Sequence, residues 1–246
     1  MRPVSSPPAE RGASIVHFRT GEDLRSRRVS DVVLVGTLDV PVPPARLTAD
    51  WEREVSLHLG LAPGDVEPLS LPRARARWPD YRQCVQATAD WLGTQDVSDV
   101  LAGSEVALMA CRGAAYHHDA ELYGGAAFCN LFLSEDLGLD LHFPMVDRRI
   151  PLVRGTAVVF DTGQPHAVVR RGHRSFDPAD FPADAACTQV FLTWELPLHD
   201  ASVARALGIQ FDRGPAVAVR PDDGHLWRQG APAAVCSRSG EWLAPA

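Results

Sequence analysis

The second half of the chain alternates short apolar runs with turn residues. The runs are five to eight residues long, and Gly, Pro or Asp stands in the gaps between them. Runs of this length and composition are typical of β-strands. No helical pattern separates them, which favours an antiparallel sandwich or jelly roll over βαβ units. The expected strands cover residues 105–111, 126–133, 139–143, 156–160, 166–170 and 188–195.

The first half mixes one strand with helices. VVLVGTL at 32–38 is an apolar, β-branched run before a Pro-rich turn and predicts a strand. A helix capped by Thr48 or Asp50 is expected through about residue 58, and a second over 80–92, ended by Gly93. Apolar residues at helical spacing give each helix one buried face, and we expect both helices to buttress the sheet. A short helix is expected at 201–207.

We find no boundary between two domains. Hydrophobic residues make up 46% of the 246 positions and charged residues 22%, a composition typical of one soluble globular domain. Residues 1–12 are rich in Pro, Ser and charge and are expected to be disordered. The predicted domain covers 13–246, with N-terminal support over 13–104, a jelly-roll core over 105–197, and a C-terminal helix and tail over 198–246.

The charge balance argues against several partners and reactions. The net charge of −7 would repel a phosphate backbone, so a nucleic-acid partner is disfavoured. The chain has no lysine, which excludes Schiff-base chemistry and a P-loop lysine. Any carboxylate of a ligand must therefore be bound by arginine or by neutral donors.

The cysteines and the apolar pattern bear on location. The five cysteines are odd in number, widely spaced and without a CxxC pair, which fits a reducing cytoplasm. No apolar run is long enough to span a membrane, and the first residues lack the apolar stretch of a signal peptide. We expect a cytoplasmic protein, monomeric or homodimeric, without a membrane partner.

One constellation of residues indicates metal chemistry. His117 and Asp119 are two positions apart, a spacing that puts both side chains on the same face of an extended strand. His166 opens a later predicted strand after the turn DTGQP. Two imidazoles and one carboxylate, with further coordination positions open, form the facial triad of non-haem Fe(II) oxygenases. His118 is turned away from this face by strand alternation.

The stretch from Tyr116 to about Leu196 resembles the Fe(II)/2-oxoglutarate-dependent oxygenases. The segment GTAVVFDTGQPHAV at 155–168 is similar to that family's run of Gly, apolar strand, turn, distal His and Val. The resemblance implies a mainly β fold with a double-stranded β-helix core, and Fe(II) bound by His117, Asp119 and His166. It also implies 2-oxoglutarate and O2 as co-substrates and oxidation of a C–H bond, usually to a hydroxyl group.

In that family a basic residue near the strand after the distal His pairs with the far carboxylate of 2-oxoglutarate. Arg170 and Arg174 share the face of His166 if the strand continues, and Arg174 is the first choice because Ser175 follows it. An insertion, FDPADFPADAAC at 176–187, interrupts the pattern. Gln189, Thr193, or an arginine at 148 or 149 is therefore an alternative anchor, although a solvated turn is the simpler interpretation of the arginine pair.

A further candidate for the co-substrate is Asn130. It lies in mid-strand among apolar residues, where an unpaired amide costs about 1–3 kcal/mol, so it needs a partner. A co-substrate carboxylate or a neighbouring backbone group would serve.

The expected substrate is a small polar molecule such as an amino acid or a natural-product intermediate. Arginines near the predicted site would suit a carboxylated one. Three alternatives remain open: a prolyl or other protein side-chain hydroxylase, a cupin-like metal-binding isomerase, and a zinc hydrolase that uses the same ligands. The absence of an HExxH glutamate weighs against the hydrolase.

Overall fold

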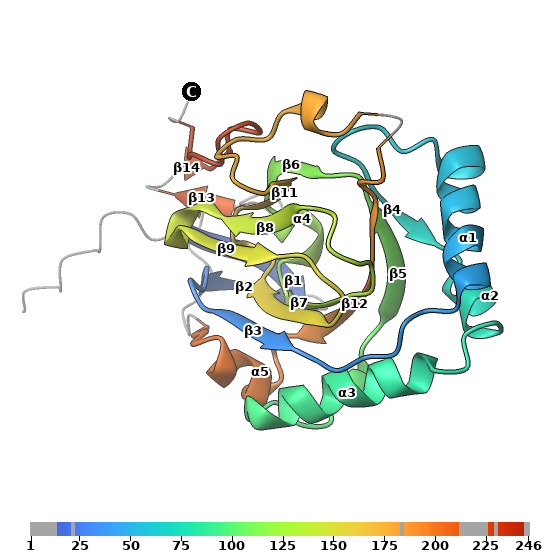
Figure 1. The fold of residues 1–246 in the computed structure, drawn as a ribbon. Coiled ribbons are helices and arrows are strands. Elements are labelled where there is room, and N and C mark those ends of the chain that lie inside the picture. The colour runs from blue at the N-terminus through green and yellow to red at the C-terminus, as the bar shows by residue number, and fades with distance from the viewer. Residues whose placement is uncertain (1–13, 21–22, 183–184, 212–225, 229–230, 244–246) are drawn as a thin grey trace, which may run out of the picture.

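Two β-sheets face each other and enclose the centre of the molecule (Figure 1). The computed structural model describes residues 14–20, 23–182, 185–211, 226–228 and 231–243. The expectation of a disordered segment over residues 1–12 falls outside these ranges.

The major sheet has six antiparallel strands. Their order is β3 (Val33–Thr37), β10 (Thr156–Asp161), β7 (Ala126–Phe132), β12 (Gln189–Pro197), β5 (Val106–Cys111) and β4 (Val66–Leu69). The minor sheet has four, in the order β6 (Ala114–His117), β11 (His166–Arg170), β8 (Leu139–Phe143) and β9 (Arg148–Pro151).

The chain passes back and forth between these sheets. From β5 to β12 each strand enters the sheet opposite the preceding one, except where β8 and β9 form a hairpin in the minor sheet. This is the winding of a double-stranded β-helix, so the predicted mainly β fold is confirmed. Every strand expected from the sequence is present. The short strands β6 and β9 were not predicted, because neither contains an apolar run.

The two faces of the major sheet differ in what covers them. Residues such as Leu108, Leu192 and Trp194 point outward and are buried under the helices. The helices are α1 (Ala45–Glu54), continued by a π-helical turn at Val55–Leu59, α2 (Leu71–Arg75), α3 (Tyr81–Thr94) and α5 (Ala201–Ala206). Figure 1 shows α1 and α3 on the outside of this sheet, the buttressing position. No described helix is both long and apolar enough to cross a membrane.

Helix α1 starts three residues earlier than the first predicted cap. Pro44 precedes it with the fixed φ of proline, and its carbonyl accepts from Leu47 N–H. Thr48 is inside the helix, where its hydroxyl donates to the carbonyl of Ala45, and Asp50 pairs with Arg53 and Arg77. Neither is a cap, so that detail of the prediction was wrong. Helix α3 likewise runs through Gly93 to Thr94.

Between the sheets lies a second hydrophobic cluster, rich in phenylalanine. Phe132, Phe143, Phe160 and Phe191 are all at most 8% exposed. Ring contacts between the sheets, such as Phe143–Phe160 at 5.2 Å, fix the spacing of the sheets. These residues define the inner face of each sheet.

The insertion at 176–187 packs onto this inner cluster. Phe176 and Phe181 are buried, and their rings stack at 5.5 Å on either side of a 3-10 turn at Pro178–Asp180. A Cβ on Gly113 would lie 2.4 Å from the Phe181 ring, so the loop before β6 fits tightly under it. The insertion therefore closes the barrel at the end where β5 finishes and β12 begins.

The two ends of the chain meet in a small third sheet. Its order is β14 (Ala231–Pro232), β13 (Leu226–Arg228), β1 (Ser14–Thr20) and β2 (Asp23–Arg28), all antiparallel. The sequence pattern did not predict it. The remaining short elements are α4 (Ala120–Tyr123) and 3-10 turns at Leu101–Gly103 and Pro144–Val146.

Candidate metal centre

Two neighbouring strands of the minor sheet bring the predicted histidines together. His117 ends β6, His166 begins β11, and the two residues face each other in the antiparallel register. Their imidazole centroids lie 4.5 Å apart. Two residues 49 positions apart along the chain thus become direct neighbours through strand pairing.

Asp119 lies beside the two histidines, but not on an extended strand as predicted. β6 ends at His117, and Asp119 precedes α4 with φ −106° and ψ 13°, so it is not part of an extended strand. Its backbone N–H donates to the carbonyl of Thr162 at 2.8 Å, which ties it to the turn before His166. The side chain does not cap α4 and is free for a ligand.

The three side chains converge on one point. The Nε2 atom of His117 lies 3.6 Å from Asp119 Oδ1, and that of His166 lies 3.5 Å from Asp119 Oδ2. One ligand atom from each residue lies within 4.8 Å of the other two. Within the described ranges this is the only group of three or more His, Cys, Asp or Glu residues that could hold a metal ion in this way.

Hydrogen bonds of the other ring nitrogens orient both imidazoles. His117 Nδ1 lies 2.7 Å from the carbonyl of Ala115, and His166 Nδ1 lies 3.0 Å from that of Gln164. Because a carbonyl only accepts, each Nδ1 carries the proton, and each Nε2 presents its lone pair to the common point. This is the tautomer that a metal site requires.

The surroundings of His166 favour its neutral form. It is 7% exposed, and Phe143 and Phe160 pack against its ring, with Phe160 at 4.8 Å. Burial, followed by the neighbouring His117, lowers the pKa of His166 to about 4. The imidazole is therefore uncharged at neutral pH and available to a cation.

A buried ion pair clamps the loops that carry the triad. Arg27, on β2 and fully buried, donates two hydrogen bonds to Asp161, at 2.6 and 2.8 Å. Its Nε donates to the carbonyl of Gly124 just after α4. The Asp161 carboxylate also accepts from the N–H groups of Ser30 and Gly163. One guanidinium thus connects the end of β10, the turn before His166 and the helix after Asp119.

Two of the co-substrate candidates line the barrel, at different depths. Asn130 is 7% exposed on β7, opposite Thr193 of β12, and its side-chain oxygen has no hydrogen-bond partner in the described structure. The partner that the sequence argument required is missing. Gln189, at the far end of β12 from the triad, donates to the carbonyl of Leu152 at 3.2 Å.

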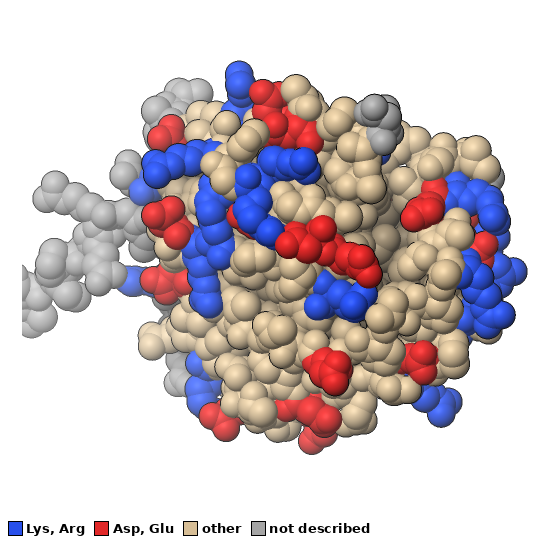
Figure 2. Space-filling model, viewed as in Figure 1, with Lys and Arg blue, Asp and Glu red and all other residues tan. Residues whose placement is uncertain are grey.

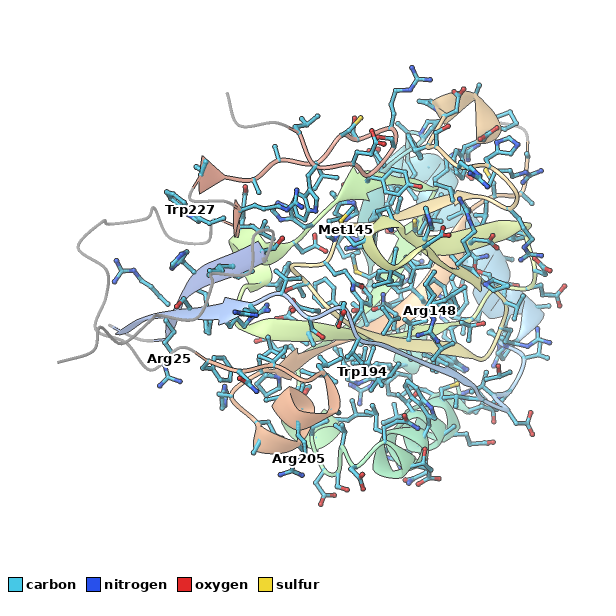
Figure 3. All side chains as sticks on the ribbon, turned by 90° about the vertical axis from the view of Figure 1, so that its left-hand side faces the viewer. Arg25, Met145, Arg148, Trp194, Arg205 and Trp227 are labelled. Atoms are coloured by element: carbon cyan, nitrogen blue, oxygen red, sulfur yellow. The ribbon has the colours of Figure 1, made fainter. Side chains whose placement is uncertain are left out.

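The arginine candidates lie elsewhere. Arg170 and Arg174 are exposed, and Arg170 donates to the carbonyl of Leu137 beyond the end of β11. Arg148, labelled in Figure 3, donates to the carbonyl of Val33 and so bridges β9 to β3. β8 and its Phe143 separate it from His166.

Other histidines stay outside the triad. His118 turns towards the C-terminal segment, with its ring 6.5 Å from that of Trp242. His142 lies on the outer face of the minor sheet, where its Nδ1 is 2.5 Å from the Tyr116 hydroxyl.

The sequence reasoning missed Glu195, which lies beside the aromatic rings that reach His166, while its cross-strand neighbour Glu105 is exposed. Glu195 is opposite Phe128 on the inner face of β12 and β7, and its N–H donates to the carbonyl of Glu105 at 3.1 Å. Strand parity could have found Glu195, because Gln189, Phe191, Thr193 and Glu195 alternate along β12.

A large surface groove lies at the other end of the barrel. It measures about 690 Å³, and its lining includes Trp51, Arg112, Ser134, Arg154 and Val190. Arg112 follows β5 and Ser134 follows β7, both at the end away from the triad. The groove is thus separate from the candidate metal centre.

The sequence matches no family model and no curated protein. Solved structures are similar in fold. A prolyl-4-hydroxylase from Pseudomonas putida is 16% identical, with 67% of this chain and 92% of that chain covered and a TM-score of 0.39. A viral collagen prolyl hydroxylase from Paramecium Bursaria Chlorella virus-1, in complex with 2-oxoglutarate, is 9% identical, with 67% and 94% covered and a TM-score of 0.40. A non-haem α-ketoglutarate-dependent epimerase from nogalamycin biosynthesis is 14% identical, with 77% and 88% covered and a TM-score of 0.34.

The chain winds as a double-stranded β-helix and brings its HxD…H residues together, which are the fold and the triad that the resemblance to the Fe(II)/2-oxoglutarate-dependent oxygenases implied. The resemblance stated from the residues is confirmed to that extent. The donor set of the triad, two imidazoles and one carboxylate, is the one that a mononuclear Fe(II) site with open coordination positions would use.

Proposed function

We propose that this protein is an Fe(II)- and 2-oxoglutarate-dependent oxygenase that oxidises a C–H bond of a small polar molecule. The observation that carries the proposal is the triad itself. Its three ligand atoms lie within 4.8 Å of one another, and both Nε2 lone pairs are oriented by hydrogen bonds on the opposite ring nitrogens. A chance cluster of surface histidines would not share this orientation.

The exposure of the triad indicates where substrates approach. The side chains of His117 and Asp119 are 39% and 23% exposed, while that of His166 is 8% exposed. Substrates therefore reach the metal from the side of His117 and Asp119. Phe143 and Phe160 exclude water on the other side, behind His166. Bound Fe(II), with O2 and 2-oxoglutarate, would supply the oxidising chemistry, and these residues hold and screen it.

Neutral donors are proposed to receive the far carboxylate of 2-oxoglutarate. Asn130 and Thr193 are cross-strand neighbours on the inner face, one row deeper than Phe128 and Glu195. The amide of Asn130 lacks a partner for its oxygen, and its two ends can exchange by rotation. With the amide turned so that its NH2 group faces the barrel, a carboxylate would accept from Asn130 and from the Thr193 hydroxyl.

The proposal is tested by anaerobic addition of Fe(II) and 2-oxoglutarate to the purified protein. We expect a visible charge-transfer band from the chelate in the parent protein and none in His166→Ala. His173→Ala is the matched control, because this exposed histidine bonds Asp180 and lies outside the triad. A parent protein that shows no band and retains zinc through purification would instead support the hydrolase.

The type of substrate is decided by succinate release in the presence of candidates. Free amino acids and natural-product intermediates should stimulate release in the parent protein. Stimulation by proline-containing peptides alone would replace the small-molecule proposal with a protein hydroxylase.

A further inference from the structure

Four neighbouring strands of the major sheet carry hydrogen-bond donors at the end away from the triad. The strand order β10, β7, β12, β5 places Arg154 before β10, Ser134 after β7, Thr188 before β12 and Arg112 after β5, each within two residues of its strand. Neighbouring strands lie about 4.8 Å apart, so the four residues form one continuous row, here called the donor row. All four are partly buried, and all four line the large groove at this end of the barrel.

The two hydroxyl groups at the centre of the donor row are available as donors. Ser134 Oγ accepts from the N–H of Val190 at 2.8 Å, which holds the side chain in place and leaves its own proton to donate. Within the described ranges, no residue accepts from Ser134 or bonds the hydroxyl of Thr188. A ligand in the groove can therefore accept from both hydroxyls without breaking a bond between them and another described side chain.

The arginines at the two ends of the donor row keep their positive charge largely uncompensated. Arg112 donates to the backbone carbonyls of Phe181 and Pro182, and no carboxylate of the described structure pairs with it. A carbonyl accepts a hydrogen bond but carries no charge to balance the guanidinium. Arg154 meets Glu135 through one contact of 3.3 Å, and the side chain of Glu135 is 79% exposed, where an ion pair is weak.

The other wall of the groove is mainly apolar. It consists of α1 and the residues just before it, and it contributes Val42, Pro43, Trp51 and Val55. Val42 is 61% exposed, although its side chain is apolar. Figure 2 shows the surface hollowed between the barrel and α1, with charged side chains of both signs at the rim. Glu52 is the acidic residue of this wall, and it is exposed to solvent.

The dimensions of the groove match those of small-molecule sites. Its volume of about 690 Å³ lies within the range of about 300–1,000 Å³ that is typical of ligand pockets. Such pockets combine apolar walls with a few polar groups that fix the orientation of the ligand. The donor row opposite the apolar wall of α1 is an arrangement of this kind.

We propose that this groove is a second binding site, and that its ligand is an organic anion with a carboxylate head and an extended apolar body. Arg112, Thr188 and Ser134 bind the two oxygens of the head, because a guanidinium and hydroxyl groups are donors that a carboxylate accepts from. Val42 and Val55 pack against the body. Glu52 and Glu135 also line the groove and favour a singly charged head over a doubly charged phosphate. The site involves neither the triad nor the proposed reaction.

The test uses three probes with the same chain and different heads: octanoate, 1-octanol and n-octylammonium. Calorimetry on the full-length, metal-free protein gives their affinities, so that no metal at the triad can bind the head. We expect octanoate to bind at least about tenfold more tightly than the alcohol, because its hydrogen bonds are charge-assisted, and n-octylammonium to bind no more tightly than the alcohol. Hexanoate should bind about tenfold more weakly than octanoate, since two methylene groups fewer are buried.

Variants assign the binding to the groove. Arg112→Gln should weaken octanoate binding about tenfold. Arg170→Gln is the matched control, because this exposed arginine also donates to a backbone carbonyl but does not line the groove, and it should leave the affinity unchanged. Val42→Glu adds a like charge at an exposed position of the apolar wall and should weaken binding about threefold or more. Its control is Val35→Glu, at a similarly apolar position of β3 outside the groove.

Two results would overturn the inference. One is octanoate that binds no more tightly than 1-octanol. The other is octanoate affinity that stays at the parent value in Arg112→Gln and, should that variant fail to fold, in Val42→Glu. Because the triad takes no part in these measurements, either result leaves the proposed function to its own test.

Discussion

At the scale of single residues, the site depends on which polar groups have partners. His117 and His166 each use Nδ1 to bond a backbone carbonyl, which leaves Nε2 available as a metal ligand. Asn130 has no partner for its oxygen, while the exposed Arg170 donates to a carbonyl outside the barrel. An unpartnered group in a buried wall is therefore a better guide to a ligand than an exposed charge near it in sequence.

The contrast between the unpartnered Asn130 and the exposed arginines favours Asn130 as the residue that binds the co-substrate carboxylate. Asn130→Ala should raise the 2-oxoglutarate concentration needed for half of the charge-transfer band by about tenfold, because a hydrogen bond to a charged group is lost. Asn130→Asp should raise it more, since it adds a like charge. Arg174→Ala should have no effect. A large shift in Arg174→Ala with none in Asn130→Ala would restore the arginine anchor.

The buried neutral histidine also makes stability depend on pH. His166 has a pKa of about 4 when folded and about 6.5 when unfolded, so the unfolded chain binds the extra proton between these values. Stability from this residue is complete above pH 6.5 and falls as the pH drops towards 4, by roughly 3 kcal/mol in the metal-free protein. Urea unfolding across this range should show a shallower pH dependence in His166→Gln. Equal slopes in the two proteins would contradict the assignment.

At the scale of secondary-structure elements, two short strands that the apolar pattern does not predict position the triad. β6 has four residues, and it places His117 opposite His166. β2 supplies Arg27, which connects the loops after β10 and α4. Both strands are too short or too polar to stand out as apolar runs, and only their pairing partners make them strands.

Removal of the Arg27 guanidinium should be strongly destabilising. Arg27→Leu leaves Asp161 buried without its counter-charge, and we expect the free energy of unfolding to fall by about 3–5 kcal/mol. The double variant Arg27→Leu with Asp161→Leu should regain most of this loss but bind metal more weakly, because the N–H groups of Ser30 and Gly163 lose their acceptor. Arg25→Leu, on an exposed position of the same strand, is the control. A double variant as unstable as the single one would show that the pair is not the cause.

At the scale of the whole molecule, the two ends of the barrel have different tasks. The triad lies at the end where β6 finishes and β11 begins. The insertion closes the opposite end with Phe176 and Phe181. The triad and the insertion that closes the barrel are thus separated by the length of the strands.

This separation predicts that stability and metal binding can be changed independently. Phe181→Ala removes a fully buried ring and should lower the free energy of unfolding by about 3–5 kcal/mol. Metal affinity, measured by Mn(II) titration of the folded fraction, should stay the same. The same truncation at the exposed Leu122 should leave stability unchanged. A loss of metal affinity in Phe181→Ala would show that the two ends are coupled.

The sequence by itself determined the strands of the core and the identity of the triad. Apolar runs with turn residues between them have a period that only a β-rich fold can bury, and His117, Asp119 and His166 are the residue types that a facial triad needs. The buttressing helices followed from the same periodicity, although their ends did not. Helix ends depend on local hydrogen bonds such as that of Pro44, which compete closely with alternatives.

Tertiary structure decided everything that depends on pairing between distant strands. It brought Glu105 beside Glu195, left Asn130 unpartnered, and placed the arginines away from the triad. It also put Asp119 at a helix start and not on the strand from which its position was argued. No local pattern specifies these contacts, because strand register is set by burial and by turns far along the chain. The triad could be found in the sequence, and the unpartnered Asn130 on the inner face could not.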